Sequence, residues 1–158
     1  MLHTPRCLIR PFRSKDLTPF MAYRNDLQWM RYQDFCGLSR GEYAAFLLEN
    51  RTLEEGIQLA VVCRKSHRLL GDLYLRREGE MLWVGCTIRP ARARQGFARE
   101  ALGGVLGAAP ALGIQRVCAE TEPANLPSAA LLESLDFRET GTRGGLRVFE
   151  REVSPRIP

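Results

Sequence analysis

Residues 84–100, VGCTIRPARARQGFARE, combine the end of a predicted strand, a loop with a single glycine and the start of a predicted helix. A strand that runs through such a loop into a helix directs several backbone N–H groups at one point, where the positive end of the helix dipole also lies. Gly96 permits close approach of a ligand, and the surrounding arginines can add charge-assisted contacts at the rim. The stretch therefore predicts a nest for a phosphate or pyrophosphate.

The same stretch has plainer interpretations. A strand-to-helix turn also needs a glycine for its backbone angle, and its arginines can simply be solvated. Neither established phosphate motif, GxGxxG or the GK[ST] of a P-loop, is present. Nucleic-acid binding is disfavoured because the chain has no lysine-rich run and a net charge of only +5. Taken alone, the stretch favours an ordinary turn.

Length and composition indicate one globular domain spanning residues 1–158. No apolar run approaches the ~18 residues that cross a bilayer, so we expect no membrane association. The start, MLHTPRCLIRPFR, lacks the apolar core and cleavage site of a signal peptide, which predicts a cytoplasmic location.

The cysteine and histidine content predicts neither disulfides nor a metal site. With only His3 and His67 available, neither a zinc site nor a Ser-His-Asp triad is expected. The cysteines are odd in number and form no CxxC pair, which favours buried free thiols in a reducing compartment. They are Cys7, Cys36, Cys63, Cys86 and Cys118.

Apolar periodicity and turn residues predict a mixed α/β fold around one sheet. Asp16 is a candidate N-cap, Ser39 and Glu42 have the spacing of a capping box, and Pro110 should end or bend the helix before it. Three strands should form an antiparallel meander, and the chain should close with a hairpin. The predicted strands are 6–12, 57–64, 68–76, 81–88, 115–121, 137–141 and 145–153; the predicted helices are one or two within 16–32, then 43–50, 100–113 and 125–135.

Together with EPANLPSAALLESLDF (122–137), the opening stretch resembles the GNAT superfamily of acetyl-CoA-dependent N-acetyltransferases. The family loop reads Q/R-x-x-G-x-G/A, and the corresponding frame here is ARQGFA (93–98). PRCLIRPFRSKDLTPFMAYRND (5–26) and LLGDLYLR (69–76) are similar to the opening and the central strand of its Rim-type, ribosomal-protein branch. The resemblance runs from about residue 4 to about residue 150 in the family's order, which shifts the interpretation to the phosphate loop.

The resemblance implies a mostly antiparallel sheet flanked by helices, with strands 81–88 and 115–121 splayed apart to admit the thioester of acetyl-CoA. Backbone amides of residues 94–98 would bind the pyrophosphate, and the end of the preceding strand would pair with the pantetheine arm. Asn125, which is also a natural N-cap, and Ser128 would face the pantetheine and the sulfur. The implied coenzyme-binding residues are Cys86, Thr87, Ile88, Arg94, Gln95, Gly96, Phe97, Ala98, Arg99, Asn125 and Ser128, with no metal.

Two departures from the family pattern affect binding and one turn. Ala93 replaces the usual Gln or Arg at the first loop position, which removes a side-chain contact that Arg92 or Arg94 could supply instead. Asp136 replaces the usual glycine before Phe137, which should change a turn more than the chemistry.

Two further departures affect the mechanism. Trp83 stands where many members carry a glutamate as general base, and Leu132 stands where many carry a tyrosine as general acid. Glu120 and Glu122 share a face of their strand by alternation and are the candidates for a base or proton relay, with solvated carboxylates as the alternative. Ser128 is the candidate donor to the departing thiolate.

The acceptor region is expected at residues 28–35, QWMRYQDF. Most of its aromatic side chains should belong to the core, and in the family this segment borders the acceptor groove. Tyr32, Gln33 and Asp34 are therefore the predicted acceptor contacts.

The sequence thus predicts an acetyl-CoA-dependent N-acetyltransferase that acts on a primary amine, either a protein N-terminus or a small molecule. The alternatives are a non-catalytic acyl-CoA-binding or regulatory module and, less favoured, a nucleic-acid-binding domain. The acceptor, the exact acyl group and the oligomeric state stay open. A homodimer through late strands such as 145–153 is one expectation.

Overall fold

The computed structural model describes residues 1–153, in which eight strands form one sheet in the order β1-β2-β3-β4-β5-β6-β8-β7. Neighbouring strands are antiparallel except β5 and β6, which are parallel. The strands are β1 (Leu2–His3), β2 (Cys7–Pro11), β3 (Ile57–Cys63), β4 (Leu69–Glu78), β5 (Met81–Ile88), β6 (Arg116–Thr121), β7 (Arg138–Arg143) and β8 (Leu146–Glu152). The α-helices are α1 (Leu17–Arg24), α2 (Arg40–Leu47), α3 (Phe97–Ala108) and α4 (Leu126–Ser134), with 3-10 helices η1 (Ser14–Asp16), η2 (Pro90–Arg92) and η3 (Ala109–Leu112).

The predicted fold class is confirmed, including the meander β3-β4-β5 and the closing hairpin β7-β8. Ser39 caps α2 as expected, because its hydroxyl accepts from the Glu42 N–H at 3.2 Å and the Glu42 carboxylate accepts in return from the Ser39 N–H. Helix α3 ends at Ala108 and the chain continues as η3, as Pro110 predicted. The predicted single domain includes residues 154–158, which lie outside the described residues.

One of the one or two helices expected within residues 16–32 forms, as α1, and the chain after Arg24 continues in turns. One expectation near the N-terminus is corrected. Asp16 does not cap α1 with its side chain. Its buried carboxylate instead accepts from the Arg13 N–H at 2.8 Å and pairs with the Arg10 guanidinium at 2.7 Å. The short strand β1 was not predicted, since two residues carry no readable periodicity.

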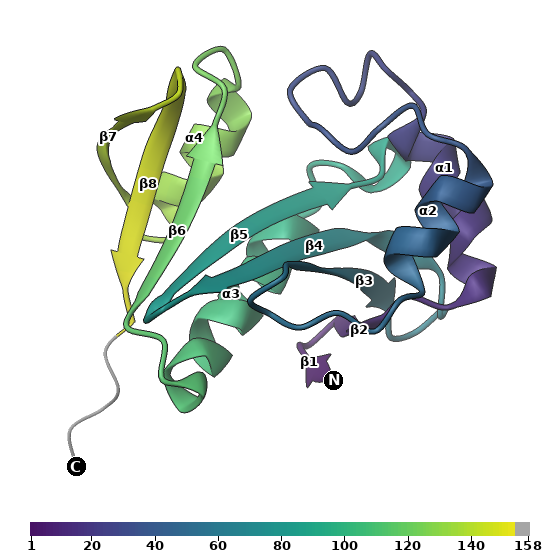
Figure 1. Ribbon diagram of the computed structural model, residues 1–158, viewed down its shortest axis with the longest axis horizontal. Helices are drawn as coiled ribbons and strands as arrows, with labels where there is room; N and C mark the ends of the chain where they lie inside the picture. The colour runs from purple at the N-terminus through teal and green to yellow at the C-terminus, as the bar shows by residue number, and fades with distance from the viewer. Residues whose placement is uncertain (154–158) are drawn as a thin grey trace.

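The two faces of the sheet carry separate apolar clusters. Each cluster lies under helices that cover that face of the sheet, α3 on one side and α1 with α2 on the other (Figure 1). Helix α3 places Ala101, Leu102 and Val105 against one face, and the same cluster continues to Leu132 on α4. Helices α1 and α2 cover the other face of β3 and β4 through a second cluster that includes Phe20.

The parallel strands β5 and β6 separate after a short contact. Their register joins only Met81–Trp83 with Arg116–Cys118, and the two strands then diverge toward their carboxyl ends (Figure 1). The remainder of β5 keeps its pairing with β4, and β6 keeps its pairing with β8. The predicted splay of strands 81–88 and 115–121 is therefore present, and it opens the sheet at one point.

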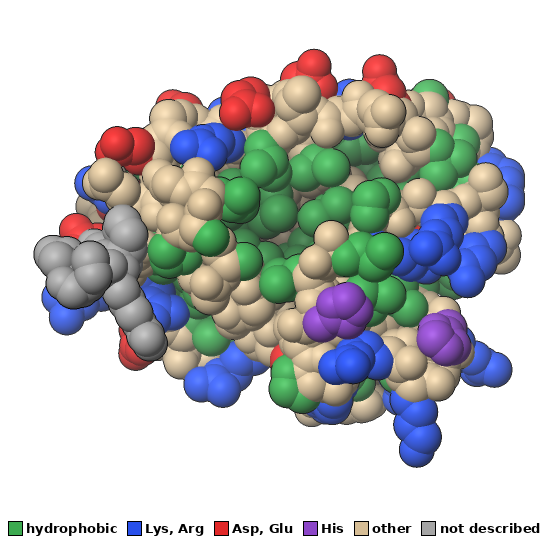
Figure 2. Space-filling model, turned by 90° about the horizontal axis from the view of Figure 1, so that it is seen from below, with side chains coloured by type: hydrophobic (Ala, Val, Ile, Leu, Met, Phe, Trp, Pro, Cys, Tyr) green, Lys and Arg blue, Asp and Glu red, His purple; other side chains and the backbone are tan. Residues whose placement is uncertain are grey.

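A second hollow lies elsewhere on the surface. Figure 2 shows apolar side chains gathered in the middle of the face seen from below. A cavity of about 510 Å³ lies between the end of α3 and the β1 side of the sheet, lined by side chains such as Leu2, Leu59 and Leu112. It shares no lining residue with the opening between β5 and β6.

Candidate active site

A cleft of about 540 Å³ occupies the opening between β5 and β6. Its floor comes from β4 and β5, one wall from the segment after α1, and the other wall from the end of β6. The sequence-predicted residues in its lining are Tyr32, Gln33, Asp34, Cys86, Thr87, Glu120 and Glu122. The structure thus brings the predicted acceptor residues, the end of β5 and both candidate carboxylates into one cleft.

The open edge of β5 presents unpaired backbone groups. Arg89 donates its N–H to β4, and backbone groups of successive strand residues alternate between the two edges. Thr87 therefore turns its N–H and C=O toward β4, whereas Cys86 and Ile88 turn theirs toward the opening. The Ile88 carbonyl accepts from the indole N–H of Trp29 at 3.1 Å. Of the three predicted strand residues, Cys86 and Ile88 have amides at the edge that a pantetheine arm would meet.

Three carboxylates face the cleft without a partner. Asp34, Glu120 and Glu122 are exposed, and their carboxylates have no hydrogen-bond or ion-pair partner among residues 1–153. Of the three arginines in the lining, Arg76 pairs with Glu78 at 3.2 Å and Arg24 pairs with a buried aspartate, whereas Arg31 donates only to the Gln28 carbonyl and has no ion-pair partner within residues 1–153. Three unpaired carboxylates thus face one unpaired guanidinium. The cleft is therefore acidic in a protein whose net charge is +5.

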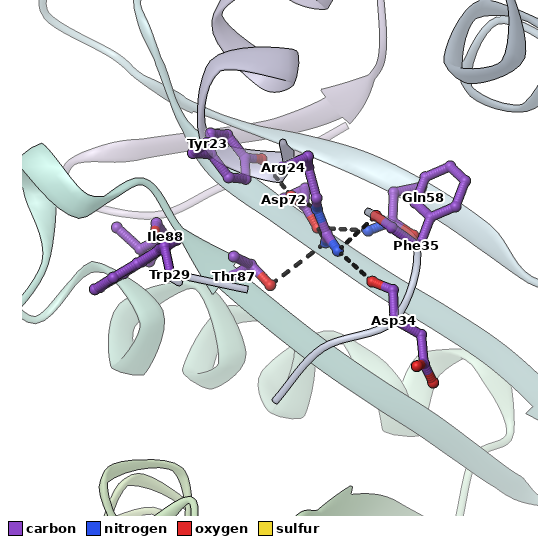
Figure 3. Close-up of polar contacts among 9 residues, drawn as sticks. All are labelled: Tyr23, Arg24, Trp29, Asp34, Phe35, Gln58, Asp72, Thr87 and Ile88. Atoms are coloured by element: carbon purple, nitrogen blue, oxygen red, sulfur yellow. Dashed lines mark hydrogen bonds and ion pairs between the residues drawn. The ribbon is translucent and has the colours of Figure 1, made fainter. Parts of the chain in front are cut away.

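A buried polar network supports the wall that carries the acceptor residues (Figure 3). The Asp72 carboxylate, on β4, accepts from Arg24 Nη2 at 2.6 Å and also from Tyr23 and Gln58. Arg24 Nη1 donates to the Asp34 carbonyl at 3.0 Å, and Arg24 Nη2 lies 3.4 Å from the Thr87 hydroxyl. Burial would lower the pKa of Arg24, but the attraction of Asp72 outweighs it and raises that pKa. The guanidinium is thus held charged between the floor and the wall.

Two polar atoms near the opening are buried without a hydrogen-bond partner in the described part of the chain: Trp83 Nε1 and the Thr121 hydroxyl. Trp83 lines the cleft and its ring lies 5.5 Å from the Arg143 guanidinium carbon. Thr121 ends β6, where the strands have separated. Unpaired buried polar atoms are uncommon in folded proteins. Trp83 belongs to the lining of the cleft, whereas Thr121 does not.

The loop between β5 and α3 has the backbone geometry that the predicted nest requires. Arg94 and Gly96 adopt left-handed backbone angles, with φ of 60° and 81°. The first helical bond runs from the Glu100 N–H to the Gly96 carbonyl, so the amides of Phe97, Ala98 and Arg99 have no partner within the helix. The Phe97 side chain is buried and the Arg99 side chain turns to the Ser134 carbonyl, which leaves the exposed Arg94 and the free amides for an anion.

The start of α4 behaves as a capped helix. The Asn125 side chain accepts from the Ser128 N–H at 3.3 Å, so the predicted N-cap is confirmed. Leu132 packs in the core, where a tyrosine hydroxyl would have no cleft to reach. Asp136 adopts φ of 65°, the left-handed conformation that a glycine favours.

Several residues of the site were not identified from the sequence. Arg24, Gln58 and Asp72 come from three separate elements, and only the fold brings them together. One signal was available, since Asp72 is a lone charge within the apolar run LLGDLYL, which favours a buried ion pair. Arg6, which contacts the α3 loop, had no comparable signal.

The sheet opens between two parallel strands, with the free amides of a helix start at the end of one strand and a polar cleft beside it. This arrangement agrees with an acyltransferase that takes its acyl group from a coenzyme A thioester, the class that the family match shows. The acetyltransferase (GNAT) domain family matches residues 6–138. The chain therefore belongs to the GNAT acetyltransferases, whose cosubstrate is acetyl-CoA.

Known proteins agree with this assignment. The uncharacterized N-acetyltransferase YnaD of Bacillus subtilis is 26% identical over 141 residues, which cover 87% of this chain and 82% of YnaD. A GNAT-family acetyltransferase structure from Bacillus anthracis is similar with a TM-score of 0.84, 21% identity and coverage of 96% and 98% of the two chains. RimL, a ribosomal L7/L12 α-N-protein acetyltransferase solved with coenzyme A, is similar with a TM-score of 0.82 and 14% identity, covering 97% of each chain.

Metal-binding groups and membrane-spanning helices were both sought within the described residues. Residues 1–153 contain no group of three or more His, Cys, Asp or Glu side chains placed to hold a metal ion. Within the same range, no helix is both long and apolar enough to cross a membrane.

Proposed function

We propose that the chain, as one domain, transfers the acetyl group of acetyl-CoA to a primary amine by direct attack on the thioester. The observation that carries this proposal is the acidic cleft at the open edge of β5, where unpaired strand amides and the free carboxylates of Glu120 and Glu122 meet. A carboxylate-lined space suits a substrate that arrives as an ammonium ion and must lose a proton before it reacts.

The coenzyme would bind along the opposite side of the opening. The amides of residues 94–98 take the pyrophosphate, with Arg94 at the rim and with Arg99 close by in the first turn of α3. The strand amides of Cys86 and Ile88 take the pantetheine arm, and Asn125 and Ser128 approach it from α4. Thr87 contributes by fixing the strand to β4 and to Arg24 rather than through its own amide.

The chemistry requires proton removal from the amine. An α-amino group with a pKa of about 8 holds far more free base at neutral pH than a lysine-like amine with a pKa of about 10.4. Glu120 or Glu122 accepts the amine proton, directly or through water. The nitrogen attacks the thioester carbon, the carbon–sulfur bond breaks, and the second proton of the attacking nitrogen passes to solvent. The thiolate takes a proton from the Ser128 hydroxyl, which solvent replenishes. A strand N–H polarises the carbonyl oxygen.

The acceptor side would be formed by Tyr32, Gln33 and Asp34. Asp34 gives this wall a third carboxylate, and its backbone is held by Arg24 at 3.0 Å. The acceptor is a small amine or a protein N-terminus. The similarity to the Rim-type branch supports a protein N-terminus as the acceptor, and this support comes from the fold alone.

Thiol release tests the proposal. The purified chain is incubated with acetyl-CoA and a panel of amines: a short peptide with a free N-terminus, the same peptide acetylated, a diamine and an amino sugar. Release that depends on a free amine, with a product heavier by one acetyl group, supports the proposal. Acetyl-CoA binding without release for any amine would favour a non-catalytic acyl-CoA module. Ser128→Ala in the same assay separates a proton donor, whose loss lowers kcat, from a helix residue, whose loss does not.

A further inference from the structure

Arg6 connects the N-terminal strands to the start of α3. It lies in the turn between β1 and β2, 89 residues before the loop residue that it contacts. Its Nη1 donates to the Gln95 carbonyl at 3.0 Å, its Nε donates to Glu100 Oε1 at 2.7 Å, and its guanidinium carbon lies 4.2 Å from the centre of the Phe97 ring. One half-exposed side chain thus contacts three positions around the helix start.

The contact with Gln95 determines where the next amide points. In a trans peptide the C=O and the N–H of one plane point in opposite directions, and the described residues contain no cis peptide. Holding the Gln95 carbonyl on the Arg6 side therefore directs the Gly96 N–H to the other side, away from Arg6. Gly96 is also where Arg6 packs closely, because a Cβ there would lie 3.3 Å from Arg6 Nη2.

Glu100 places a negative charge in the first turn of α3, close to the amides that would bind an anion. Partial burial would raise the pKa of Glu100, but hydrogen bonds from Thr4 and Arg6 outweigh this effect and lower that pKa to about 2. Glu100 is therefore fully ionised at neutral pH. An unpaired carboxylate at this position would repel a pyrophosphate. The Glu100 carboxylate is not unpaired, because it accepts hydrogen bonds from Arg6 Nε at 2.7 Å and from the Thr4 hydroxyl at 2.5 Å.

We propose that Arg6 is the positioning residue of the coenzyme loop: it orients the Gly96 amide and neutralises Glu100, so that the helix start accepts the pyrophosphate of acetyl-CoA. The proposal rests on the proposed binding of that pyrophosphate by residues 94–98. It also accounts for Ala93, which offers no side-chain contact at the first loop position. The organising contact comes from the N-terminal strands instead of from Arg92 or Arg94.

Binding of coenzyme A and of pantetheine, measured by calorimetry, tests the proposal without any amine acceptor. The two ligands share the pantetheine arm, and only coenzyme A carries the pyrophosphate. We expect Arg6→Gln to weaken coenzyme A at least tenfold, which corresponds to about 1.4 kcal/mol, and to leave pantetheine within twofold. The double variant R6Q/E100Q should recover part of the loss, because the unpaired carboxylate is gone. Arg138→Gln, on the exposed edge strand β7, removes the same charge far from the loop and should change neither affinity.

Three outcomes would overturn the proposal. Equal weakening of both ligands by Arg6→Gln would indicate a general structural role, and unchanged coenzyme A affinity would remove any role. A wild-type chain that binds coenzyme A no more tightly than pantetheine would show that the loop does not bind the pyrophosphate, and the proposed function would fail at that point first. If Arg6→Gln does not fold, Arg6→Lys decides by the same comparison. It keeps the charge but not the planar fork that spans Gln95 and Glu100, so we expect a selective loss for coenzyme A.

Discussion

Arg24 and Asp72 form a buried ion pair, with Nη2 2.6 Å from Oδ1 and both side chains at most 5% exposed. The same guanidinium donates to the carbonyls of Asp34 and Phe35 at 3.0 Å and 3.3 Å. The pair therefore joins strand β4, in the middle of the sheet, to the segment that forms the acceptor wall. Stability and substrate positioning depend on one charge cluster.

Removing either partner of this pair should be strongly destabilising. Arg24→Met leaves Asp72 as an uncompensated buried charge, and we expect a loss of about 3–5 kcal/mol in the free energy of unfolding. Urea unfolding measures this loss. Glu78→Gln breaks the exposed pair with Arg76 and should cost less than about 1 kcal/mol. Similar losses for both variants would contradict the view that burial makes the inner pair sensitive.

The carboxylates of Glu120 and Glu122, at the end of β6 and just after it, should control the pH dependence of turnover. Replacing the one that accepts the amine proton, by Glu120→Gln or Glu122→Gln, is expected to lower kcat/KM by roughly 10²- to 10⁴-fold at neutral pH. The loss should shrink as the pH approaches the pKa of the amine, because free amine then forms without help. Thiol release between pH 6 and pH 10 measures the profile, with Glu54→Gln as a distant control. A loss that stays constant across this range would assign the carboxylate to binding.

Adjacent glycines of α3 should respond in opposite directions to the same change. A Cβ at Gly103 meets nothing within 4 Å, so Gly103→Ala should raise stability by about 0.5–1 kcal/mol through helix propensity. A Cβ at Gly104 would lie 2.8 Å from the Thr4 methyl carbon and 3.3 Å from Leu2, so Gly104→Ala should destabilise. Thermal unfolding of both variants gives the comparison. Stabilisation by both would mean that Thr4 and Leu2 do not pack against Gly104.

Glu100 should stabilise the fold in a pH-dependent way. Its folded pKa of about 2 lies below the ordinary value of 4.5, so the folded state binds this proton less readily than the unfolded chain does. The stabilisation is therefore complete above about pH 4.5 and is lost as the pH falls toward 2. Unfolding of the wild type and Glu100→Gln at pH 6 and pH 3 should show the wild-type advantage shrinking at the lower pH. An advantage that grows on acidification would reverse the assignment.

Local patterns in the sequence were sufficient for most of the secondary structure and for the family. Apolar runs separated by polar turns predicted β3, β4 and β5 within one or two residues, and Ser39 with Glu42 marked the start of α2. The loop around Gly96 was recognisable because a left-handed glycine before a helix is a local requirement. Alternation also placed Glu120 and Glu122 on one side of β6, and both do line the cleft.

The sequence by itself thus determined the elements, their order and the family, since capping, strand alternation and turn chemistry act between residues a few positions apart. Tertiary structure alone decided which charges meet. Arg24 reaches Asp72 across 48 positions, and Arg6 reaches Glu100 across 94. Such pairs depend on where the strands and helices pack, and an arginine has the same appearance in a sequence whether it is solvated, buried in an ion pair or holding a loop. The acceptor wall and the support of the coenzyme loop depend on that packing.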